Sequence, residues 1–141
     1  MAQVDYLHLC DLAFMDEAGK HCIIGMFDIV RAISFPCTHP TMTVAMRVLS
    51  QPGEAIKLKF ELGRPNGNVI VTLPMDIVAG PDGGANINLN LQQVQFPEAG
   101  RYTLKIVQGQ ETLASRSIRL QKIDPPQQAP PAPQSDKKKL H

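Results

Sequence analysis

Alternation of apolar and polar residues over short stretches is the feature of this 141-residue sequence that most constrains its fold. Residues 55–62 read Ala-Ile-Lys-Leu-Lys-Phe-Glu-Leu, so every second side chain is apolar. Because successive side chains of a β-strand point to opposite faces, this period of two predicts a strand with one buried and one wet face. The same alternation recurs at residues 42–48 and 86–91, and the apolar spacing of an amphipathic helix is absent from all three stretches.

Turn-forming residues separate these stretches. Glycine, proline and asparagine, which favour chain reversal, cluster at residues 16–19, 51–53, 65–67, 80–84, 97–100 and 108–110. The intervals between them predict eight strands, at roughly residues 4–14, 20–28, 41–50, 55–63, 68–78, 85–96, 101–108 and 112–122. Residues 28–34 fit either a short helix or a continuation of the second strand. Short strands, close turns and almost no helical pattern together predict an antiparallel β-sandwich of seven or eight strands.

The apolar parity changes inside the predicted strand at residues 85–96. Odd-numbered positions are apolar up to Leu91, after which Val94 and Phe96 are the apolar ones. One extra residue near Gln92 and Gln93 would restore the alternation, so we predict a β-bulge there.

The composition changes near residue 122. Residues 1–121 contain ten Lys and Arg against eleven Asp and Glu, whereas residues 122–141 contain four Lys and two Asp. Five of the twelve prolines follow Ile123, and this segment has too little apolar bulk to offset the entropy of ordering it. We therefore predict one β-sandwich domain at residues 1–122 and a disordered, proline- and lysine-rich tail at residues 123–141.

Charge and hydropathy bound the partners and the compartment. The net charge of +1 gives no long-range attraction to nucleic acid or to an anionic membrane. Asp5 and Asp11 interrupt the first apolar stretch, which lacks the basic start of an export signal. No apolar run approaches the ~18 residues of a membrane span. With three cysteines, an odd number, we expect reduced thiols and a cytoplasmic protein.

Each cysteine has a histidine beside it or one residue away, which raises the question of a metal site. The pairs are His8 with Cys10, His21 with Cys22, and Cys37 with His39. Zinc sites use about four ligands, usually paired by spacings such as Cys-x-x-Cys, and none of these pairs has that spacing. A hairpin around residues 16–19 would set Cys22 opposite Ala13 and Cys10 opposite Gly25. The two thiols would then lie roughly 10 Å apart along the sheet, too far for one metal unless the register slips.

The purely structural interpretation is that Cys10 and Cys22 are small buried apolar residues. Cys37 and His39 lie between two prolines at residues 35–40, which we expect to form a loop. A Cys–His nucleophile pair would fit such a loop, and so would a structural hydrogen bond. The candidate metal ligands are therefore Cys37, His39, His8 and Cys10. We assign no catalytic residue and no cofactor, because the known motifs for nucleophilic, zinc-hydrolase and phosphate-binding sites are absent.

Residues 96–106 resemble the entry to a late strand of immunoglobulin-like sandwiches, in which an Ala-Gly-x-Tyr turn precedes an alternating strand. In such domains the tyrosine hydroxyl caps the turn, a role that would fall to Tyr102. The alternative is an ordinary strand tyrosine with an exposed hydroxyl. The disulfide pattern of immunoglobulin domains is missing, since no cysteine lies near Tyr102.

Three stretches of sequence, at residues 9–28, 35–47 and 89–102, combine short motifs such as Leu-Cys-Asp-Leu-Ala, His-Pro and Phe-Pro-Glu-x-Gly-x-Tyr. As a set, covering about residues 4–121, they resemble a family of small uncharacterised bacterial proteins of the domain-of-unknown-function kind. The resemblance implies a bacterial origin and a β-sandwich. It brings no activity and no catalytic residues.

We expect a non-enzymatic module for protein interaction or assembly, whose partner is another protein or a second copy of the chain. The uncharged face formed by Asn86, Asn88 and Asn90 is the expected interaction surface. The alternative is a metal- or small-molecule-binding protein, or an enzyme, with its site at residues 35–40. That alternative needs a further titratable group close to Cys37 and His39. A subunit of a phage-like or secretion-system assembly is a third possibility.

Overall fold

The computed structural model describes residues 1–126, so the predicted tail lies outside the described residues from residue 127 onward. The described residues contain no helix and form nine strands. The strands are β1 (Gln3–Met15), β2 (His21–Met26), β3 (Ile29–Ala32), β4 (Cys37–Leu49), β5 (Ala55–Gly63), β6 (Val69–Val78), β7 (Gly84–Phe96), β8 (Gly100–Gln108) and β9 (Glu111–Lys122).

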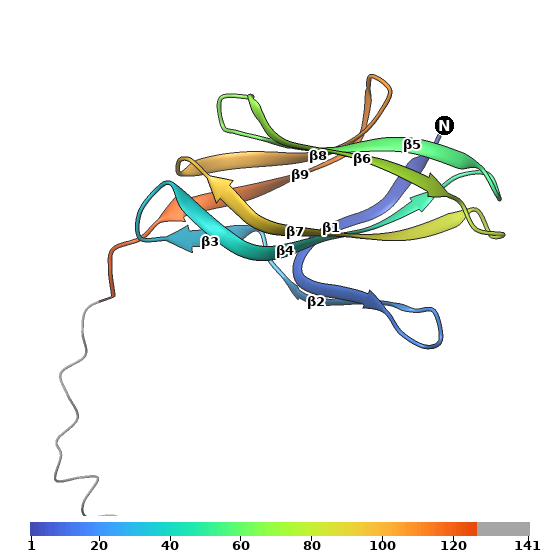
Figure 1. The fold of residues 1–141 in the computed structure, drawn as a ribbon, viewed down its shortest axis with the longest axis horizontal. Coiled ribbons are helices and arrows are strands. Elements are labelled where there is room, and N and C mark those ends of the chain that lie inside the picture. Colours follow the sequence, from blue (N-terminus) through green and yellow to red (C-terminus); the bar gives the residue numbers. More distant parts are fainter. Residues whose placement is uncertain (127–141) are drawn as a thin grey trace, which may run out of the picture.

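The strands form two sheets packed face to face (Figure 1). One sheet has the order β2-β1-β4-β7 and the other has the order β3-β9-β8-β5-β6. All neighbouring strands run antiparallel except β3 and β9, which are parallel. The predicted antiparallel β-sandwich is thus confirmed. Within residues 1–126, no helix is long and apolar enough to span a membrane.

The core fills the space between the sheets, and the alternation seen in the sequence places residues there. Ile56, Leu58, Phe60 and Leu62 of β5 are all buried, whereas Lys57 is exposed. The facing sheet contributes a matching set from β1, β4 and β7, including Leu7, Leu9, Met42, Val44, Met46, Val48 and Leu91. Because burial of one such side chain contributes about 1.5–3 kcal/mol, this set is the main favourable contribution to folding.

Tyr102 forms the tyrosine corner that the sequence suggested. Its hydroxyl donates a hydrogen bond to the carbonyl oxygen of Glu98 at 2.8 Å and accepts one from the Glu98 backbone N–H at 3.1 Å. The ring is fully buried and meets Phe96 edge to face, with ring centroids 5.1 Å apart. The alternative of an exposed strand tyrosine is therefore wrong.

Two local predictions differ from the structure. Residues 29–32 form strand β3, which pairs with the end of β9, so the helical alternative for residues 28–34 is wrong. Gln93 does have a left-handed backbone, with φ of 54°. However, Thr41 pairs with Gln92 and His39 with Val94 in one unbroken register, so β7 holds no extra residue relative to β4. In both strands the buried side chains switch between odd and even positions at the same place, next to Pro40 in β4. This shared switch explains the change in the apolar pattern of β7 without a bulge.

Strand β2 folds over the outer face of its own sheet (Figure 1). The side chain of Ile23 packs on Cys10, Ala13 and Ala45, which form a second small core apart from the main one. Ala45 alternates with inward-facing neighbours on β4, yet it is fully buried, so its cover must come from the outside. Gly25 supplies the bend, since its φ is 72° and a side chain there would collide with the Asp11 carboxylate.

Candidate functional site

The cysteines and histidines of the first hairpin do not converge. Cys10 pairs with Met26 and Cys22 with Phe14, one residue away from the register expected from sequence. Cys10 is fully buried, and its thiol donates to the Thr43 carbonyl oxygen at 3.5 Å. Burial raises the pKa of the Cys10 thiol above its usual value. These contacts describe a buried structural cysteine. Its neighbour His8 instead contacts Arg116.

Cys37 and His39 lie in strand β4 rather than in a loop, so the expected loop at residues 35–40 is wrong for residues 37–40. Cys37 pairs with Phe96 and packs against the core, and burial raises the pKa of its thiol. The His39 ring lies 5.6 Å from the Phe27 ring. Nowhere in residues 1–126 do three His, Cys, Asp or Glu side chains come close enough to hold a metal ion.

The Asn86, Asn88 and Asn90 side chains lie on the outer side of β7, and the Oδ1 atom of each lies within hydrogen-bond distance of a side chain from another strand of the same sheet. Asn86 Oδ1 accepts from Arg47 at 3.1 Å, and Asn90 Oδ1 accepts from the Thr43 hydroxyl at 2.9 Å. Asn88 Oδ1 lies 2.6 Å from His21 Nε2. The face predicted for interaction is therefore fixed in place by its own sheet, while its Nδ2 groups donate to no described residue.

A relay of three side chains runs across this face. The Tyr6 hydroxyl lies 2.6 Å from His21 Nδ1, and His21 Nε2 reaches Asn88. A neutral imidazole with its proton on Nε2 satisfies both contacts, because Nδ1 then accepts from the hydroxyl and Nε2 donates to the amide oxygen. Sequence reasoning missed Tyr6, because its partner depends on how β2 folds over the sheet.

The outer edge of β7 is the long open edge of the sandwich. β7 is thirteen residues long and pairs only with β4. It contains no charged residue and no proline. The other edges are protected by devices that sandwiches commonly use: β6 carries Pro74 and the exposed Asp76, while β2 and β3 have only six and four residues.

A groove lined by apolar and amide side chains lies beside this edge, where β7 and β6 end their two sheets. The groove has a volume of about 620 Å³. Its apolar lining comes from Ile70, Val71 and Leu73 of β6 and from Leu91 and Val94 of β7. A chain that paired with β7 would therefore have apolar side chains available on its inner face.

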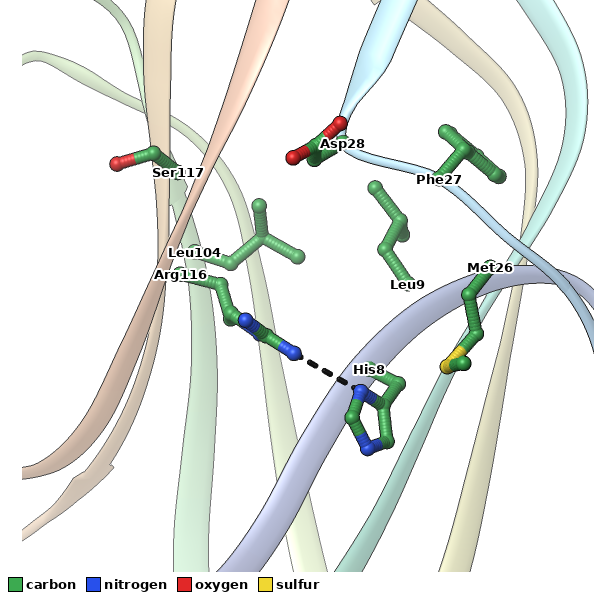
Figure 2. Close-up of a pocket in the computed structure, with 8 residues that line it drawn as sticks. All are labelled: His8, Leu9, Met26, Phe27, Asp28, Leu104, Arg116 and Ser117. Carbon is green, nitrogen blue, oxygen red and sulfur yellow. Dashed lines mark hydrogen bonds between the residues drawn. The ribbon is translucent and has the colours of Figure 1, made fainter.

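A separate cavity of about 500 Å³ opens at the opposite side of the sandwich, between β1 and β9 (Figure 2). Arg116 of β9 reaches across to the other sheet: its Nε donates to the Leu7 carbonyl oxygen at 2.7 Å, and its terminal nitrogen lies 2.9 Å from His8 Nδ1. The pairing of β2 with β1 starts at Cys10, so β2 does not reach Leu7. Arg116 instead donates the hydrogen bond to the Leu7 carbonyl oxygen.

The charges in this cavity favour a neutral His8. Burial first, and then the Arg116 guanidinium and His21, lower the pKa of His8 below its usual value of 6.5. Figure 2 shows Leu9 and Leu104 between the His8–Arg116 pair and Asp28, which lies at the far end with Ser117. Sequence reasoning named His8 as a metal candidate but missed Arg116, since 108 positions separate the two and no local pattern records the contact.

Two face-to-face sheets and a tyrosine corner define this protein as an immunoglobulin-like β-sandwich. The chain belongs to the family of unknown function DUF6941, whose model matches residues 5–121. The family resemblance expected from the sequence is thereby confirmed.

Solved structures share the fold at low sequence identity. The alkylpurine DNA glycosylase AlkC of Pseudomonas fluorescens, solved with DNA containing an abasic-site analogue, aligns with 85% of this chain at 8% identity and a TM-score of 0.53. The alignment spans only 30% of the glycosylase chain. An immunoglobulin-like protein from Pseudomonas aeruginosa aligns with 86% of this chain and 97% of its own at 16% identity and a TM-score of 0.45. No curated protein sequence matches the chain.

Proposed function

We propose that this protein is a non-enzymatic module for protein interaction or assembly that binds its partner along the outer edge of β7. The observation that carries the proposal is the edge itself: thirteen residues with one neighbouring strand and neither a charge nor a proline to block a second. Natural sandwiches protect such edges, because unpaired N–H and C=O groups recruit strands from other chains. The left-handed Gln93 is an irregularity near one end of β7, and the long uncharged edge before it is best explained by a partner.

The addition of a partner strand would use both the unpaired backbone groups of β7 and the groove beside it. The backbone groups of β7 would provide hydrogen bonds, and the groove lined by Ile70, Leu73 and Leu91 would take alternate side chains of the added strand. This chemistry favours an extended partner segment with apolar residues at every second position. The three cysteines are free, which supports a role in a reducing compartment, and we place that role in a bacterial cytoplasm.

The test compares three immobilised baits: the wild-type protein, an Asn90→Lys/Gln92→Lys variant of β7, and a Thr72→Lys/Val78→Lys variant of β6. All four positions are exposed, and both variants add two charges to the edge strand of one sheet. The baits are exposed to a bacterial extract that also contains untagged copies of this chain. Proteins or copies retained by the wild type and the β6 variant, but lost from the β7 variant, would support the proposal. A set of retained proteins that is the same for all three baits would refute the role of β7.

A second candidate function is the binding of a small carboxylate in the cavity at His8 and Arg116. The cavity replaces residues 35–40 as the place for such a site, since it joins a guanidinium to an apolar floor of Leu9 and Leu104. Pockets of a few hundred Å³ with a few convergent polar groups are typical ligand sites. Titration with benzoate, followed through the NMR signals of His8, tests it: saturable shifts that vanish in Arg116→Gln would support binding, and unsaturated or unchanged signals would reject it.

A further inference from the structure

We infer that the strand received by β7 is β7 of a second copy of this chain, so that two sandwiches join through one continuous sheet. This inference rests on the function proposed above and names its partner. The two copies would be related by a two-fold axis, with their β7 strands antiparallel. The joined sheet would run β2-β1-β4-β7 in one copy and continue through the same four strands of the other in reverse order.

The charge pattern favours a copy of the same strand over a foreign one. A two-fold axis places equivalent residues opposite or near each other, and like charges facing each other across two strands are destabilising. β7 has no charged residue, so its self-pairing meets no such repulsion. Pairing over its whole length sets Asn90, the central residue, opposite Asn90 of the second copy.

Amide side chains make this edge complementary to itself. Each asparagine or glutamine carries one acceptor oxygen and an NH₂ donor, so an amide can pair with an identical amide across the axis. The Oδ1 atoms of Asn86, Asn88 and Asn90 are already occupied within the sheet. Their Nδ2 groups donate to no described residue and remain available to the second copy. A charged foreign strand would find no opposite charge along β7.

The groove beside the edge offers apolar surface that a second copy would bury. Leu91 and Val94 of β7, with Ile70 and Leu73 of β6, line this groove at the open side of the sandwich. A second copy of β7 would bring its own inward-facing apolar residues to this position. Thirteen residues at ~3.3 Å each give a seam of about 40 Å. β6 would not extend the other sheet in the same way, because Pro74 lies next to its centre and has no backbone N–H to donate near the two-fold axis.

The experiment is native mass spectrometry and sedimentation velocity of the full chain across a wide range of concentrations. We expect wild-type particles of twice 15.5 kDa that dissociate on dilution. Asn90→Lys/Gln92→Lys should raise the dimer dissociation constant roughly tenfold or more, since lysines then meet at the axis. Thr72→Lys/Val78→Lys should dimerise as the wild type does. Asn90→Ala/Gln92→Ala, which removes the amides near the axis and the Thr43 contact without adding charge, should weaken the dimer by less than Asn90→Lys/Gln92→Lys does.

Hydrogen exchange on the same samples identifies other occupants of the edge. Protection of β7 amides that rises with concentration supports the second copy. Protection in a monomer would mean that another segment of the same chain covers β7, and a wild type that stays monomeric at every concentration would equally overturn the inference. A dimer that survives Asn90→Lys/Gln92→Lys would place the interface elsewhere. A dimer that is lost in Asn90→Lys/Gln92→Lys would support the proposed function as well, whereas a monomer at every concentration would remove only the second copy as the partner and leave the proposed function to the comparison of the three baits.

Discussion

The hydroxyl of Tyr102 closes the turn before β8 by bonding twice to one residue: it donates to the carbonyl oxygen of Glu98 at 2.8 Å and accepts from its N–H at 3.1 Å. Both bonds lie beside a ring that is fully buried against Phe96. Hydrogen bonds in such dry surroundings are costly to leave unmade. The Tyr102 hydroxyl thus holds the backbone of Glu98, while Arg64 Nε donates to the Glu98 carboxylate at 3.2 Å.

Tyr102→Phe is expected to lower the free energy of unfolding by about 1–3 kcal/mol, because the two backbone groups of Glu98 lose their partner while ring packing is kept. Urea denaturation followed by circular dichroism measures the change. Tyr6→Phe is the matched control, since the Tyr6 hydroxyl also makes a hydrogen bond, to His21, but on a partly exposed face. Equal losses for the two variants would mean that the corner has no special weight.

The parts of the fold that were predictable from sequence are those set by local pattern. The period of two along residues 55–62 is the burial pattern of β5, and the turn sequence before Tyr102 identified the corner. The register of β1 and β2 was missed by one residue. The two strands are joined by a turn of five residues, in which the Asp16 carboxylate accepts a hydrogen bond from the Lys20 N–H. Met15 therefore pairs with His21, and every later pair is shifted by one residue from the expected register. Propensities alone do not distinguish such turns.

The candidate sites were harder to predict, because they depend on contacts between distant parts of the chain. Arg116 meets His8 only because β9 and β1, each the second strand from an edge, lie in facing sheets. His21 meets Asn88 because β2 folds over the sheet, which no alternation records. The open edge of β7 follows from strand order, and strand order in a sandwich is a property of the whole topology. The sequence did show that this strand is uncharged, which became informative once its position was known.

Gly25→Ala is expected to destabilise the protein more than Gly19→Ala. Both glycines have left-handed backbones, with φ of 72° and 81°, so each substitution carries a strain of about 1–2 kcal/mol. Only at Gly25 would the new methyl group also collide with the Asp11 carboxylate, whereas nothing lies within 4 Å at Gly19. Thermal unfolding of the two variants separates crowding from backbone strain.

If Gly19→Ala proves as damaging as Gly25→Ala, the close approach of Asp11 has no energetic weight. The double variant Gly25→Ala/Asp11→Ala supplies a second check. It should recover part of the loss seen in Gly25→Ala, because it removes the side chain that the methyl group would meet.

The stability of the protein is expected to fall as pH falls through the usual pKa of histidine, partly because of His8. The pKa of His8 is lowered in the folded protein by burial, by Arg116 and by His21, so the unfolded chain binds the proton first as the pH drops. The contribution of His8 to the free energy of unfolding is fully present above pH 6.5 and falls on acidification through that value. The loss stops once the pH lies below the pKa of His8 in the folded protein. The difference between wild type and His8→Gln isolates the effect.

Denaturation midpoints measured between about pH 4.5 and 8 should therefore converge or cross for wild type and His8→Gln at acidic pH. In Arg116→Gln the NMR-detected pKa of His8 should rise, because the variant removes a cation that lies 2.9 Å from Nδ1. A pKa of His8 that is the same in both proteins would show that the guanidinium does not act on the ring. A His8→Gln curve parallel to that of the wild type would show that His8 does not contribute to the pH dependence.

Cys10 should resist alkylation in the folded protein for as long as β2 stays folded over the sheet. Iodoacetamide reacts with the thiolate, and burial both raises the pKa of the Cys10 thiol and blocks access to it. Cys22, half-buried at the start of β2, is the internal reference in the same spectrum. Peptide mass spectrometry after timed labelling measures the two rates, and we expect Cys22 to react while Cys10 stays unmodified.

Ile23→Ala tests whether that protection comes from β2 itself. Ile23 packs on Cys10, Ala13 and Ala45, so its truncation should loosen the cover of the second small core and leave the main core between the sheets intact. Labelling of Cys10 should then accelerate by more than the change in global stability explains, because local opening exposes the thiol without full unfolding. If the acceleration only matches the loss of global stability, β2 opens together with the sandwich. The relay from Tyr6 through His21 to Asn88 would then persist for as long as the fold itself, because β2 carries its central histidine.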